Sequence, residues 1–67
     1  MPIFTFDIVF KNQKTGEEET VRKEYAGGEW FNALDQVMEF VKGEIVRRYY
    51  ETKRYDWYLD TIKNYLA

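Results

Sequence analysis

The most informative stretch of this 67-residue sequence runs from residue 3 to residue 10 and reads IFTFDIVF. Large apolar side chains recur there at every second position, which is the period of a β-strand with one buried face. The face expected to be buried carries Phe4, Phe6, Ile8 and Phe10. The opposite face mixes apolar and polar side chains, so these residues predict a half-buried strand.

The residues that follow this strand predict a β-hairpin. Residues 11–17 (KNQKTGE) are polar and contain one Gly, which is typical of a hairpin loop. Residues 18–25 predict the returning strand, with Val21 and Tyr25 facing inward. Its other positions are mostly charged, and such charge is typical of an edge strand that faces solvent.

The hydrophobic pattern changes to a helical period after Gly27 and Gly28, two residues that favour a turn. The helix starts near residue 30, with either Asn32 as N-cap or Gly28 as N-cap and Glu29 in the first turn. Apolar residues then recur at steps of three and four, which indicates a helix with one apolar face. They are Trp30, Leu34, Val37, Val41, Ile45 and Tyr49.

One residue interrupts this helical pattern. Gly43 costs about 1 kcal/mol relative to Ala inside a helix. We nevertheless expect the helix to continue through it, because Glu44 can pair with Arg47 and Arg48 one turn later.

The C-terminal residues fit two structures. Residues 51–54 (ETKR) form a polar gap where we expect a bend. As a helix, the residues after it place all but one of their large side chains on one stripe: Tyr55, Tyr58, Leu59, Ile62, Tyr65 and Leu66, with Trp57 outside it. As a strand, residues 55–59 alternate apolar and polar positions, and their composition favours β-structure. The helical pattern accounts for more residues, so we predict a second helix.

The fold expected from these elements is one α+β domain over residues 1–67. In it a β-hairpin packs on a long helix that is followed by a second, C-terminal helix, in the order ββαα. The alternative order is ββαβ, with a third strand near residues 55–59.

The composition of the chain indicates how this domain is stabilised and in which compartment we expect it. So short a chain buries a modest share of its surface, and its two Trp, six Tyr and five Phe compensate with large apolar area. Cys is absent, so no disulfide strengthens the fold, and this favours an intracellular, cytoplasmic protein. We expect neither a signal peptide nor a membrane span, because no uncharged run approaches the ~20 residues that a spanning helix needs.

The side chains that are missing exclude several chemistries. The sequence has no His, no Cys and no Ser, which removes the Ser–His and Cys–His pairs of nucleophilic catalysis. Zinc, copper and non-haem iron lose their usual ligands for the same reason. Gly27-Gly28 lacks the spacing of a phosphate-binding loop. We therefore expect no enzymatic activity, no cofactor and no metal site.

The candidate binding segment is residues 47–58, RRYYETKRYDWY, which interleaves four basic residues with five aromatic ones. Arg, Tyr and Trp are the side chains that most often anchor protein interfaces. The partner-binding residues that we predict are Arg47, Arg48, Tyr50, Lys53, Arg54 and Trp57. Tyr50 and Trp57 lie off the predicted apolar stripes and are the expected exposed anchors. The alternative is that Tyr49, Tyr55 and Tyr58 belong to the core, with the basic residues on a solvated face.

The sequence therefore predicts a small protein-interaction module, of which an inhibitor or regulator acting by surface occlusion is one form. Small accessory proteins of phages and mobile elements are often of this kind. Single-stranded nucleic acid is the second candidate partner, and it is disfavoured because residues 42–54 hold five basic and two acidic residues while the whole chain has a net charge of −2. A structural homodimer is the third, since one edge of the first strand is expected to be unpaired and its outer face, with Ile3 and Val9, is partly apolar.

Overall fold

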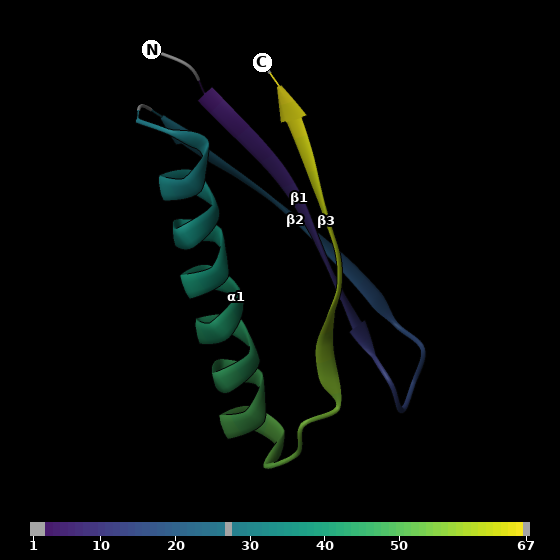
Figure 1. Cartoon of the computed structure of the whole chain (residues 1–67). Coiled ribbons are helices and arrows are strands. Elements are labelled where there is room, and N and C mark those ends of the chain that lie inside the picture. The colour runs from purple at the N-terminus through teal and green to yellow at the C-terminus, as the bar shows by residue number, and fades with distance from the viewer. Residues whose placement is uncertain (1–2, 27, 67) are drawn as a thin grey trace.

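The computed structural model describes residues 3–26 and 28–66, with side chains through residue 64. Four elements follow one another along the chain (Figure 1). They are β1 (Ile3–Asn12), β2 (Glu18–Ala26), α1 (Trp30–Thr52) and β3 (Trp57–Leu66). The domain is therefore α+β, with the order ββαβ.

The three strands form one antiparallel sheet in the order β2-β1-β3, so β1 lies at its centre. Ile8 marks the middle of the sheet, because it is opposite Val21 on one side and Ile62 on the other. The register between β1 and β3 shifts once, between Val9 and Phe10, and leaves Asp60 as an extra residue in β3. Such a bulge bends and twists the strand that contains it.

The predicted second helix is wrong, and the ββαβ alternative describes the chain better. The third strand covers Trp57–Leu66, longer than the expected 55–59. Pairing with β1 is available to this segment only in the folded chain, and it satisfies backbone groups that the hairpin would otherwise leave exposed. The expectation that one edge of β1 is unpaired is also wrong, because β3 occupies it.

The core lies between α1 and one face of the sheet. The four predicted inward residues of β1 are all buried, and Phe6, Ile8 and Phe10 have no exposed surface. They face three buried residues of the helix, Ala33, Val37 and Val41. Val21 and Tyr25 of β2 are half-buried against this cluster, as predicted. Figure 1 shows α1 along this one face of the sheet.

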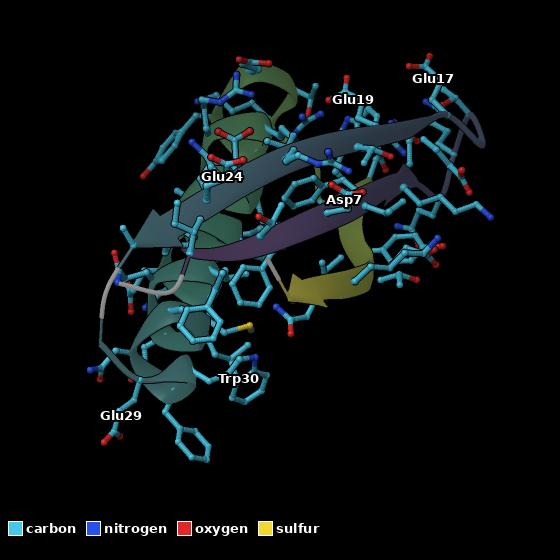
Figure 2. All side chains as sticks on the ribbon, turned by 90° about the horizontal axis from the view of Figure 1, so that it is seen from above. Asp7, Glu17, Glu19, Glu24, Glu29 and Trp30 are labelled. Carbon is cyan, nitrogen blue, oxygen red and sulfur yellow. The ribbon has the colours of Figure 1, made fainter. Side chains whose placement is uncertain are left out.

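The opposite face of the sheet has no element over it in the part of the chain that the structure describes (Figure 1). It carries mostly polar side chains, as an antiparallel sheet can when one face meets water. Asp7 accepts two hydrogen bonds from Arg22, from Nε at 2.7 Å and from Nη2 at 3.0 Å. Acidic side chains are spread along the hairpin of β1 and β2. Figure 2 shows Glu17, Glu19 and Glu24 in order from the tip of this hairpin.

Neither predicted N-cap is the observed one: the cap lies one residue after Gly28 and three residues before Asn32. Glu29 is the N-cap, and its side chain makes no capping hydrogen bond. Gly28 has a φ of 74°, which a Gly adopts without strain, and so turns the chain into the helix. The helix continues through Gly43 as predicted. Among the described residues, no helix is both long and apolar enough to cross a membrane.

Candidate functional site

The candidate segment contains the end of α1, a tight turn and the start of β3. The helix ends at Thr52, inside the predicted bend. Lys53 follows it in the left-handed conformation, with a φ of 60°, and its N–H donates to the carbonyl oxygen of Tyr49 at 2.6 Å. The N–H of Arg54 then donates to Oγ1 of Thr52 at 3.2 Å. These bonds satisfy backbone groups at the end of the helix and fix the path of the turn.

The same turn is attached to the distant hairpin loop. The N–H of Gln13 donates to the carbonyl oxygen of Asp56 at 2.8 Å, and its Nε2 donates to the carbonyl oxygen of Tyr55 at 3.1 Å. The loop itself is shaped by the buried Asn12, whose Oδ1 accepts two backbone N–H groups at 2.8 and 3.0 Å. The backbone that carries Tyr55 is therefore fixed from both sides.

Arg48, a predicted partner-binding residue, is buried, with 8% of its surface exposed. Its guanidinium carbon lies 4.4 Å from the ring centre of Trp57 and 5.4 Å from that of Phe10. It forms an ion pair with Glu19 of β2, and its Nε lies 3.7 Å from a carboxylate oxygen of Glu44. The expectation that Arg48 offers its charge to a partner therefore needs correction, because this side chain joins the helix to the sheet.

Trp57 is half-buried and packs against the core, so its expected exposure is wrong. It falls off the apolar stripe only if residues 55–66 are helical. As the first residue of β3 it is opposite Asn12, and its side chain shares the inner face of the sheet with Leu59. The change from helix to strand thus turns this ring from the surface toward the core, where it is half-buried.

Three tyrosines of the segment are joined by ring contacts and are here called the tyrosine platform: Tyr49, Tyr50 and Tyr55. Tyr50 and Tyr55 are 65% and 63% exposed. The half-buried Tyr49 joins them, since it stacks on Tyr55 with ring centres 4.3 Å apart and meets Tyr50 edge-on at 5.8 Å. Nζ of Lys53 lies 5.2 Å from the centre of the Tyr50 ring.

The exposure of the tyrosines agrees fully with neither of the two sequence-based interpretations. The exposure of Tyr50 agrees with its role as a predicted anchor. Tyr55 and Tyr58 are exposed rather than part of the core, the latter to 40%. Tyr55 was missed as a surface anchor because the helical interpretation placed it on the apolar stripe. The signal that identifies it is its position in the turn, outside both regular elements.

Arg47 lies beside the platform and pairs with two carboxylates of its own helix. Its guanidinium is 2.9 Å from Glu44 and 2.5 Å from Glu51, and the predicted pairing of Glu44 with both arginines is therefore present. The hydrogen bond from Arg47 holds the pKa of Glu44 below its ordinary value, against a smaller opposing effect of burial. The same hydrogen bond and the two negative charges raise the pKa of Arg47.

The other exposed basic residues of the segment also have neighbours. Nε of Arg54 lies 3.4 Å from a carboxylate oxygen of Asp56. Lys53 is left as the basic residue of residues 47–58 that has no ion pair within the described part of the chain, and it lies over an aromatic ring. These ion pairs neutralise much of the positive charge of the segment. It therefore attracts an anionic ligand less than its four basic residues indicate.

The candidate segment contains no enclosed site in the part of the chain that the structure describes. Within residues 3–26 and 28–66 no pocket is found, and no group of three or more Asp and Glu side chains is arranged to hold a metal ion. Its capacity for recognition therefore rests on the exposed rings and on the charges at their margin. Comparison of the chain with protein-family models, with curated proteins and with solved structures finds no significant match.

Proposed function

We propose that this chain is a non-enzymatic protein-binding module that contacts its partner through the tyrosine platform. The observation that supports this most directly is the exposure of two neighbouring tyrosines, Tyr50 at 65% and Tyr55 at 63%, in a part of the chain whose backbone is fixed. Tyrosine provides a large contact area with few rotatable bonds, and it is enriched among the residues that dominate binding energy.

The fixed geometry of the platform supports the same proposal. The ring of Tyr55 stacks on Tyr49, and hydrogen bonds from Gln13 hold the backbone below it. A surface that is ordered before binding loses less conformational entropy when a partner arrives. The platform therefore needs little rearrangement to form a contact.

The charged residues at the margin complete an interface of ordinary composition. Arg47 and Arg54 keep 53% and 58% of their side chains exposed while paired with carboxylates, and Lys53 lies beside Tyr50. Polar, solvent-accessible margins around an apolar centre are typical of protein–protein contacts. In this proposal the chain acts by occlusion, as an inhibitor or regulator that covers a surface of its partner.

Single-stranded nucleic acid is the second candidate, because exposed tyrosine rings also stack on bases. The ion pairs count against it. Arg47, Arg48 and Arg54 all lie near carboxylates, and phosphate binding would have to compete with these interactions. The net charge of −2 adds a general repulsion of a polyanion.

Matched tyrosine variants test the proposal. The tagged chain, its Tyr50→Ala/Tyr55→Ala variant and its Tyr58→Ala variant are used to capture proteins from a lysate of the native host, with quantification by mass spectrometry. Tyr58 is the control because it is an exposed tyrosine of β3, outside the platform. We expect a partner that the first variant loses and the control retains, with melting temperatures within a few degrees of the parent chain. A partner retained by the double variant would contradict the proposal.

An oligonucleotide titration separates the two candidate partners. A labelled single strand is added at about 50 mM salt, where electrostatic affinity is large. We expect no binding. Binding that disappears in the Tyr50→Ala/Tyr55→Ala variant would assign the platform to nucleic acid instead.

A further inference from the structure

The outward side of α1 carries an apolar stripe that the core does not use. Phe31, Met38 and Val46 are 69%, 45% and 40% exposed. They are separated by seven and eight residues, a spacing that returns to the same side of a helix. The exposed Asp35 and Lys42 lie between them. Since each residue turns a helix by 100°, all five side chains fall within a band about 80° wide around the helix axis. These five residues are called the outer stripe.

The two charges of the outer stripe have no ion pair within the part of the chain that the structure describes, although other charges of the helix do. Glu44, Arg47 and Glu51 form a network one turn further along. Asp35 and Lys42 take part in no such contact. The stripe is therefore acidic in its first half and basic in its second, with apolar side chains at both ends and in the middle.

We infer that the outer stripe binds a second copy of this chain, with the two α1 helices antiparallel across a two-fold axis near residue 40. In this arrangement Met38 is level with Lys42 of the second copy, and Phe31 is level with Tyr49. Asp35 of one chain and Lys42 of the second copy lie on the same side of the axis, five and two residues from it. These opposite charges are therefore offset along the helix by three residues, or about 4.5 Å. Each such contact occurs twice because the axis is two-fold.

The charge pattern also selects the direction of the second helix. A parallel pair would place Asp35 against Asp35 and Lys42 against Lys42, which is repulsive at both positions. The antiparallel pair places unlike charges together at both. A symmetric dimer requires a surface that is complementary to itself. The outer stripe meets this requirement in the antiparallel orientation, and for this reason we assign it to a second copy of the chain. The 23-residue helix provides a seam about 34 Å long.

Charge reversal tests this dimer. Sedimentation equilibrium is measured for the parent chain, for Asp35→Lys, for Lys42→Asp, for the doubly reversed chain, and for an equimolar mixture of the two single variants. We expect the parent chain to be a dimer and each single reversal to raise the dissociation constant about tenfold or more, because it places like charges at two contacts. The double reversal restores the attraction.

The mixture of the two single variants is the most decisive of these samples. A dimer with one chain of each variant has unlike charges at both contacts, so two chains that associate weakly alone are expected to form a dimer together. This result also shows that both variants are folded. A parent chain that stays monomeric at millimolar concentration, single reversals that leave the dissociation constant unchanged, or a mixture that fails to associate would each overturn the inference.

Discussion

At the scale of single residues, the interior of this domain depends on a charged side chain. Arg48 is buried between the helix and the sheet, where its guanidinium lies 4.4 Å from the ring centre of Trp57 and pairs with Glu19. Its long aliphatic part fills space that a shorter side chain would leave empty, and its charge is compensated on site. Burial thus assigns Arg48 and its neighbour Arg47 to different roles, although both occur in one basic segment.

Replacement of these two arginines by alanine is expected to have unequal effects. Arg48→Ala removes packing against Trp57 and leaves Glu19 without its partner, and we expect it to lower the free energy of unfolding by about 2–4 kcal/mol. Arg47→Ala removes only exposed ion pairs, with an expected loss of about 0.5 kcal/mol. Urea denaturation of both variants measures the difference. Equal losses would show that Arg48 is not a structural residue.

At the scale of elements, the helix and the third strand differ in how they are specified. The residues of α1 show a helical period over six turns, and Glu44 and Arg47 add local ion pairs. The residues of β3 fit either period. Their structure is selected by β1, which offers an edge of unpaired backbone groups, and by Leu59 and Ile62, which complete the inner face of the sheet.

The Glu44–Arg47 pair makes a pH-dependent contribution to the stability of α1. The folded chain holds the pKa of Glu44 below its ordinary value of 4.5, so the pair stabilises the folded state above that pH and loses its effect as the pH falls through the lowered value. Glu44→Gln removes this term. We expect the parent chain to melt at a higher temperature than the variant at pH 7, and the two melting temperatures to converge as the pH falls below the lowered pKa of Glu44. A difference that stays constant over this range would contradict the assignment.

At the scale of the whole molecule, the sheet protects its two outer edges in different ways. The outer strand β2 is highly charged, and β3 contains the bulge at Asp60. Both features discourage pairing of an edge strand with other chains. The three most exposed large apolar side chains that the structure describes, Phe31, Tyr50 and Tyr55, instead lie on the outer stripe of α1 and on the tyrosine platform.

Hydrogen exchange tests this topology. Amides of a central strand point alternately to its two neighbours, so a β1 paired on both sides is expected to exchange slowly at every residue from Phe4 to Lys11. A chain without β3 would expose every second amide of β1 and give an alternating pattern. Residue-resolved exchange by NMR distinguishes the two patterns.

The sequence by itself determined the hairpin, the long helix, the inward face of β1 and the absence of His, Cys and Ser. These follow from composition or from periodicity over neighbouring residues, which the local backbone geometry sets. Only the tertiary structure decided that residues 57–66 form a strand, that Arg48 and Trp57 turn inward, and that Tyr55 is exposed. Each of these depends on contacts between residues far apart in the chain, such as β1 with β3, and a local pattern that fits two periods cannot select between them.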